Sequence, residues 1–153
     1  MQPLIFTCPQ LTRGGKFPIE HTGRGQNISP AFDLANLSPQ AQTLAITLED
    51  LTHPIEGFTH WVIWNIPAAA HIDAAIPAGK AVPALGQAVQ GIGYGLHRYA
   101  GPKPPQGKTH QYRFTLYALD CALALGAHAG KRQFLRRAQQ HIVQMGSLLG
   151  EFE

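Results

Sequence analysis

The chain has 153 residues, 44% of them hydrophobic, which is enough for one globular domain with a buried core. Charged residues make up only 14% and the formal net charge is +3. Only residues 131–137 come close to the clustered basic stripe expected of a nucleic-acid-binding protein, and an ordinary solvated helix face accounts for them. No apolar run approaches the roughly 18 residues of a membrane span, and the N-terminus does not match a signal peptide. We therefore expect one domain over residues 1–153, cytoplasmic, without a transmembrane segment or a nucleic-acid partner.

Strand patterns dominate the first half of the chain. The sequence predicts a short strand over residues 3–8 and a mainly irregular, glycine-rich loop over residues 14–30. Apolar residues alternate with others over residues 44–49, which is typical of a half-buried strand. Residues 61–66 are apolar on both faces, which indicates a central strand, and Pro67 should end it.

The second half mixes a long loop with a strand and a helix. Residues 68–106 are rich in glycine and proline and have no clear period. They predict a long irregular loop on the surface, and such loops often carry functional residues. From Tyr112 to Ala118 the side chains alternate as in a strand. Apolar residues recur at helical spacing over residues 130–145, which predicts an amphipathic helix packed on the sheet. Cys8 and Cys121 are isolated and fit free thiols in a reducing compartment.

Basic residues crowd the first half of this predicted helix. They are Lys131, Arg132, Arg136 and Arg137. Because the N-terminal end of a helix favours anions, these cations stand at its less favourable end. Two interpretations stay open here: tolerance of the charges at an exposed site, or an anionic partner at this face.

Polar residues stand where predicted strands meet loops. Asp50 ends the strand that begins near residue 44, and His60 opens the apolar strand. His110 and Tyr112 share one face of the strand that follows the rigid proline-rich turn of residues 101–107. Each residue alone could have a structural role, such as a turn cap or a core histidine. Together, one carboxylate, two imidazoles and a phenol predict a small concave binding site.

Such a site suits a phosphate ester, because imidazoles and a tyrosine hydroxyl donate to phosphate oxygens while Asp50 attracts an amine or orients a histidine. A metal triad of two histidines and a carboxylate is an alternative, although no close ligand spacing supports it. The sequence contains no G-x-S-x-G nucleophile elbow. We therefore expect a non-enzymatic binding protein without a cofactor or metal, and keep a metal-dependent hydrolase as a further alternative.

The order of these motifs resembles the phosphatidylethanolamine-binding protein family, and most closely its bacterial Raf kinase inhibitor-like branch. The resemblance covers nearly the whole chain from Phe6 onward. Each motif alone is weak evidence, but the motifs taken together in this order are specific. The motifs that carry it occupy residues 27–30, 47–54, 58–61, 101–105 and 110–112.

The resemblance implies a mainly β domain, built on a Greek-key antiparallel sheet in a sandwich-like arrangement, with a few peripheral helices including a C-terminal one. It also implies a small pocket for phosphate-bearing head groups. The positions that match the family's pocket are Asp50, His60, His110 and Tyr112. Gly101 and Pro102 match the bordering loop, which is expected to contribute backbone donors. Family members also inhibit kinases or proteases by docking, and bacterial relatives are often dimers, so a regulatory inhibitor and a homodimer are implied as well.

The segment after Asp50 departs from the family pattern. Where relatives have a second Asp and a small residue before the proline, this chain has Thr52 and His53. The change removes one negative charge from the pocket rim and adds an imidazole, so preference for an anion should rise. We expect Thr52, His53 and Pro54 to support the pocket, and the resemblance implies a cis peptide bond before Pro54.

Overall fold

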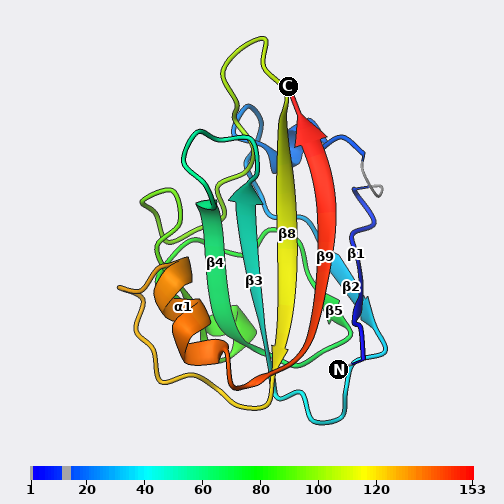
Figure 1. Ribbon diagram of the computed structural model, residues 1–153, viewed down its shortest axis with the longest axis vertical. Helices are drawn as coiled ribbons and strands as arrows, with labels where there is room; N and C mark the ends of the chain where they lie inside the picture. Colours follow the sequence, from blue (N-terminus) through cyan, green and yellow to red (C-terminus); the bar gives the residue numbers. More distant parts are fainter. Residues whose placement is uncertain (1, 12–14) are drawn as a thin grey trace.

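Two antiparallel β-sheets enclose the main core in the computed structural model, which describes residues 2–11 and 15–153 (Figure 1). The smaller sheet has the strand order β1-β2-β5 and the larger has the order β6-β7-β4-β3-β8-β9. The strands are β1 Ile5–Thr7, β2 Phe32–Ala35, β3 Thr43–Asp50, β4 Phe58–Pro67, β5 His71–Ile72, β6 Ala81–Val82, β7 Ala88–Gln90, β8 His110–Leu119 and β9 Ile142–Phe152. The helices are the 3₁₀ turns η1 Ile19–His21 and η2 Pro83–Leu85 and the α-helix α1 Lys131–Ala138. The expectation of a mainly β fold with peripheral helices is confirmed.

β3 lies between β4 and β8, and all of its residues are buried. The expectation of a half-buried strand is therefore wrong. Leu44 and Ile46 face the core between the two sheets, whereas Ala45 belongs to a second core on the opposite face of the large sheet. The alternation along β3 thus separates two buried faces, because α1 and the loop before it cover the side that would otherwise meet solvent.

The predicted central strand and the predicted strand beyond Tyr112 are both confirmed. β4 is interior to the sheet and ends at Pro67. In β8, Phe114 faces the core between the sheets and contacts Phe32 of the small sheet edge-on at 5.1 Å between ring centroids. Both rings are fully buried, and each contributes roughly 1.5–3 kcal/mol through burial. This aromatic contact joins the two sheets close to the beginning of β8, where the candidate site lies.

The C-terminal region differs from its prediction. The helix ends at Ala138, and the chain then forms β9, which pairs with β8 along its whole length. Phe134 and Ala138 are buried one helical turn apart, as expected of an amphipathic helix. The apolar residues that followed at helical spacing, Ile142 and Met145, belong instead to β9. This strand bonds to β8 along one side and, near its ends, to the N-terminal segment on the other, so its backbone groups find partners outside a helix.

The segment of residues 68–106, predicted to be a long irregular loop, also contains regular structure. It includes the short strands β5, β6 and β7 and the turn η2. Strands of two or three residues are too short to show a hydrophobic period, which explains why the sequence pattern missed them. Cys8 and Cys121 are free thiols, as expected. In the part of the chain that the structure describes, no helix is long and apolar enough to cross a membrane.

Candidate functional site

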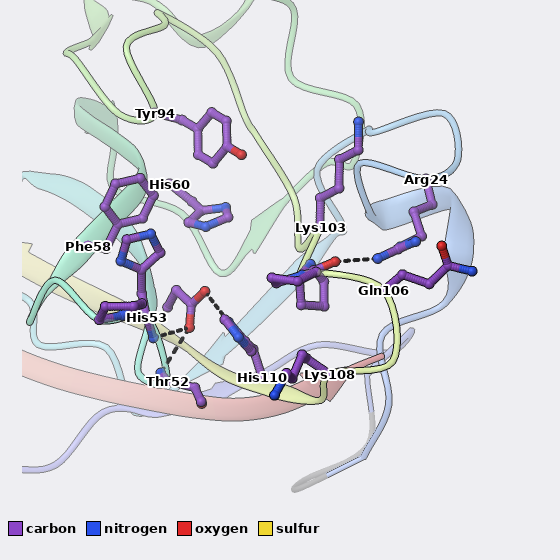
Figure 2. Close-up of a pocket in the computed structure, with 14 residues that line it drawn as sticks. Arg24, Thr52, His53, Phe58, His60, Tyr94, Lys103, Gln106, Lys108 and His110 are labelled. Atoms are coloured by element: carbon purple, nitrogen blue, oxygen red, sulfur yellow. Dashed lines mark hydrogen bonds and ion pairs between the residues drawn. The ribbon is translucent and has the colours of Figure 1, made fainter.

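A pocket of about 920 Å³ lies where β3 ends and β8 begins. Figure 2 shows aromatic and imidazole rings gathered on one side of it and long polar side chains on the other. The ring side consists of His53, Phe58, His60 and Tyr94, and the opposite side carries Arg24, Lys103, Gln106 and Lys108. The pocket therefore joins an apolar wall to a cationic one.

Asp50 and His110 meet because antiparallel pairing places the end of β3 beside the start of β8. Asp50 Oδ2 accepts a hydrogen bond from His110 Nδ1 at 2.6 Å, and Oδ1 accepts the backbone N–H groups of Thr52 and His53 at 2.9 and 3.0 Å. Asp50 is thus both the turn cap and the partner of a histidine, and both of its oxygens are engaged. With Nδ1 bound to the carboxylate, Nε2 is the ring nitrogen through which His110 can bind a ligand.

His60 is buried at the start of β4, and its Nδ1 lies 2.9 Å from the carbonyl oxygen of Ala100. Burial lowers the pKa of this imidazole, so the ring is neutral near pH 7. A neutral ring that donates from Nδ1 leaves Nε2 as an acceptor. His60 would therefore accept a hydrogen bond from the hydroxyl of a singly protonated phosphate or from an ammonium group, rather than donate to a phosphate oxygen as expected from the sequence.

Tyr112 lies beneath the pocket and outside its lining residues, next to both histidines. Its ring centroid is 5.5 Å from that of His60 and 6.3 Å from that of His110. Its buried hydroxyl completes no hydrogen bond with the described residues, although the backbone N–H of Lys103 lies nearby. Burial raises the pKa of this phenol well above its ordinary value. The hydroxyl is therefore a neutral donor without an acceptor, which is costly in a buried site unless a water or ligand supplies one.

Gly101 and Pro102 lie outside the pocket lining and fix the loop that forms one wall. The Gly101 N–H donates to Asn27 Oδ1 at 2.7 Å, and the Pro102 carbonyl accepts the Gly23 N–H at 2.8 Å. A Cβ atom at position 101 would stand 2.2 Å from the carbonyl oxygen of His21, so only glycine fits. The Gly101 N–H, which the sequence suggested as a ligand donor, is already bonded within the protein.

The turn after β3 places Thr52, His53 and Pro54 at the pocket. The His53 ring stacks on Phe58 at 4.0 Å with an angle of 7° between planes, and Thr52 Oγ1 accepts the Gln111 N–H at 2.9 Å. All peptide bonds between described residues are trans, so the expected cis bond before Pro54 is wrong. The two backbone bonds to Asp50 close this turn with the ordinary trans geometry.

Sequence reasoning missed several side chains that line the pocket. Arg24 comes from the glycine-rich segment that was predicted to be a loop, and its guanidinium donates to the carbonyl of Pro104 on the same side of the pocket. Tyr94 sits in a glycine-rich turn with φ of 53° and contacts Phe58 and His60 at centroid distances of 5.7 and 4.8 Å. Lys103 lies inside the proline-rich motif that the sequence analysis did identify. Its positive charge within that motif was the one feature of the sequence that could have marked it as a pocket residue.

The charges around the pocket are unbalanced. Arg24, Lys103 and Lys108 contribute three cations to the lining. Asp50 is the one carboxylate among the described lining residues, and its oxygens already accept three hydrogen bonds. The pocket therefore presents a net positive field to a ligand.

Comparison with known proteins places the same fold and sequence pattern in one family. Residues 7–153 match the family model described as phosphatidylethanolamine-binding protein. A UPF0098 protein of Pyrococcus horikoshii is 35% identical over 89% of this chain and 70% of its own length. The crystal structure of a phosphatidylethanolamine-binding protein homologue from Chlamydia trachomatis matches with a TM-score of 0.86 and 26% identity, over 99% of this chain and 97% of that one. E. coli YbcL has the same TM-score of 0.86 at 22% identity, over 99% of both chains, and supports the fold alone.

Proposed function

The chain belongs to the phosphatidylethanolamine-binding protein family, and from this we propose that it is a non-enzymatic binding protein for phosphate-bearing small molecules or lipid head groups. The observation that carries the proposal is that three cations, Arg24, Lys103 and Lys108, line a pocket whose carboxylate, Asp50, is already engaged. A phosphate group would meet cations there without a free carboxylate to repel it.

The two walls suit different parts of one ligand. Hydrogen bonds between a charged donor and a phosphate are worth about 1.5–3 kcal/mol each, so Lys103 and Lys108 would supply most of the affinity for the anionic group. The Tyr112 hydroxyl beneath the pocket would gain the acceptor that it lacks. Phe58 and Tyr94 form an apolar wall against which the remainder of the ligand can pack.

The hydrogen bonds that the polar groups of the pocket make within the protein also favour ligand binding over catalysis. Asp50 caps a turn and holds His110, and His60 is held through Nδ1 by a backbone carbonyl. Thr52 Oγ1, a hydroxyl in the lining, accepts a backbone N–H and lies on the turn that Asp50 closes. These groups hold the protein's own loops in place, which favours a preformed binding surface.

Isothermal titration calorimetry with phosphoethanolamine, inorganic phosphate and nucleotides tests the proposal. We expect saturable heat with at least one of them, weakened about tenfold or more in a Lys103→Met protein because one charge-assisted hydrogen bond is lost. Lys80→Met is the matched control, since Lys80 is exposed and lies outside the pocket lining. Absence of heat with all three ligands at millimolar concentration would exclude the proposed function.

A further inference from the structure

The end of the large sheet opposite the pocket carries a second cluster of chemically active side chains. Asp120 and Cys121 follow the last residue of β8, and His141 precedes the first residue of β9. One carboxylate oxygen, one sulfur and one ring nitrogen from these residues all lie within 4.8 Å of one another. We infer that these three residues form a binding site for a divalent transition metal, with Zn²⁺ as the preferred ion.

The backbone holds all three residues in place before any ion arrives. The Asp120 N–H donates to the His141 carbonyl at 3.0 Å, and the His141 N–H donates to the Ala138 carbonyl at 2.7 Å. The Cys121 carbonyl accepts a hydrogen bond from Thr43 Oγ1 at 2.7 Å. Since β8, β9 and the end of α1 fix these backbones, only side-chain torsions remain to be set, and a preorganised site binds more tightly than one that must be assembled.

The spacing of the donor atoms suits a small tetrahedral ion. Zinc binds oxygen and nitrogen at about 2.0–2.2 Å and sulfur at about 2.3 Å, which puts neighbouring ligand atoms roughly 3.5 Å apart. His141 Nδ1 and Asp120 Oδ1 are 3.0 Å apart, so a small rotation of the side chains creates the ion's position between them. The two side chains are 44% and 46% exposed, which gives a hydrated ion access and leaves room for a water as the fourth ligand.

The donor set and its surroundings identify the class of ion. A thiolate with an imidazole favours borderline-soft ions such as Zn²⁺ over Mg²⁺ or Ca²⁺, which prefer oxygen ligands alone. α1 ends at Ala138, whose carbonyl bonds to His141. The C-terminal end of a helix carries partial negative charge, so it attracts a cation to this place.

This cluster is separate from the anion pocket. β8 runs from His110 at the pocket to Leu119 beside Asp120 (Figure 1), so the two sites lie roughly 30 Å apart at the rise of a strand. The metal triad that the sequence suggested, Asp50 with His60 and His110, lies at the other end of the sheet. The two sites can therefore be tested independently on the same protein preparation.

Titration of reduced protein, freed of any affinity tag, with ZnCl₂ in a calorimeter tests the inference. We expect one Zn²⁺ per chain, and at least about 100-fold weaker binding in each of Cys121→Ser and His141→Ala, because each removes a ligand. Titration with Co²⁺ should produce the absorption of a cobalt–thiolate bond in the wild type and not in Cys121→Ser. Circular dichroism confirms that each variant is folded.

His71 provides the matched control. It lies between Asp33 and Asp73 at 2.6 and 3.0 Å and so resembles the cluster in charge and exposure but has no thiol partner. His71→Ala should bind Zn²⁺ as the wild type does. Absence of Zn²⁺ binding at about 1 mM, binding that survives Cys121→Ser, or binding that is lost in His71→Ala would each overturn the inference.

Discussion

Tyr99 and Tyr112 are buried in the same core and differ in the partner of the hydroxyl. The Tyr99 hydroxyl donates to the His21 carbonyl at 2.6 Å, whereas that of Tyr112 has no bonded partner among the described residues. We expect Tyr99→Phe to lower the free energy of unfolding by about 1–3 kcal/mol, because it leaves a buried carbonyl unpaired. Tyr112→Phe should leave stability unchanged or raise it by up to about 1 kcal/mol. Urea denaturation of both variants measures the difference.

The same pair separates stability from binding. If the Tyr112 hydroxyl donates to the ligand, Tyr112→Phe should weaken phosphate binding while the protein stays at least as stable. Equal destabilisation by the two substitutions would contradict this, since it would mean that the Tyr112 hydroxyl is already bonded in the free protein.

His60 should make stability depend on pH. Burial lowers its pKa in the folded protein, while the unfolded chain keeps a value near 6.5. Below about pH 6.5 the unfolded state therefore binds more protons, and the free energy of unfolding falls as the pH falls towards the lowered pKa of the folded state. We expect His60→Gln to reduce the loss of stability between about pH 7.5 and 5.5, as measured by denaturation at each pH.

His71 gives a control of opposite sign. The hydrogen bond to Asp33 raises the pKa of this exposed imidazole. Its stabilising contribution is therefore complete below the ordinary pKa of histidine and is lost as the pH rises through the raised value. His71→Ala should remove stability at low pH, whereas His60→Gln should preserve it. If stability fell more steeply with falling pH in His60→Gln than in the wild type, the lowered pKa of His60 would not be the cause of the pH dependence.

The sequence located site residues where a strand pattern met a polar residue. Asp50, His60 and His110 were found in this way, because strand ends on neighbouring strands converge at one edge of a sheet. Arg24 and Tyr94 were missed because irregular segments bring them to the pocket, and loop paths depend on tertiary contacts that no periodicity encodes. Whether these residues bind a ligand stays a prediction.

At the level of secondary structure, the long strands were predictable and the C-terminal helix was predicted too long. Gln133 accepts the Gly130 N–H at 2.8 Å and helps to start α1, but apolar residues beyond Ala138 satisfied both a helical and a strand pattern. Gly146 and Gly150 lie in β9, where a Cβ would stand 2.8 Å from the Leu4 carbonyl and 2.6 Å from the Phe17 ring, respectively. These close approaches by the N-terminal segment explain the glycines, and they are visible only in three dimensions.

The basic start of α1 also has a tertiary explanation. Lys131 Nζ lies 3.2 Å from Glu49 Oε2 of β3 and donates to the Gly57 carbonyl, while Arg113 of β8 reaches the same carboxylate oxygen at 3.4 Å. Glu49 is buried, so these cations compensate a charge that would otherwise be costly to bury. For Lys131, neither simple tolerance at an exposed site nor a separate anionic partner is needed.

Lys131→Met should therefore destabilise the protein by about 1–3 kcal/mol, somewhat less than the loss of a whole buried ion pair because Arg113 remains. Arg132→Met, one residue along the helix and exposed, should change stability by less than about 0.5 kcal/mol. Thermal and urea denaturation provide the measurement. A similar loss of stability in the two variants would show that Lys131 does not compensate the buried charge of Glu49.

Across the whole molecule, the N-terminal segment protects an edge of the large sheet. The Leu4 N–H donates to the Met145 carbonyl and the Phe17 N–H donates to the Glu151 carbonyl, so both ends of β9 are covered. Leu4 and Phe6 are buried in the core between the sheets. An uncovered edge strand would be open to pairing with another molecule.

Deletion of residues 1–7 should lower the free energy of unfolding by about 3–6 kcal/mol, from the burial of two apolar side chains at roughly 1.5–3 kcal/mol each. The shortened protein should also aggregate at concentrations where the full chain stays dispersed, as light scattering can measure. Removal of the exposed Glu153 serves as the control. A shortened protein of unchanged stability would mean that β1 contributes little to the fold.

Several properties of the whole molecule stay predictions. They are a cytoplasmic location, a homodimer, assignment to the Raf kinase inhibitor-like branch, and regulation of a kinase or protease by docking. Size-exclusion chromatography with light scattering decides the oligomeric state. Pull-down with the wild type and a Lys103→Met variant decides whether a protein partner depends on the pocket.

The proline-rich wall of the pocket is tied to the segment around η1 by three separate hydrogen bonds. Gly101 bonds to Asn27, Pro102 to Gly23, and Pro104 to Arg24. Its backbone therefore loses its conformational entropy when the chain folds and not when a ligand arrives. Binding to this pocket should then show only a small entropic penalty from loop ordering, and fast association without a slow rearrangement step.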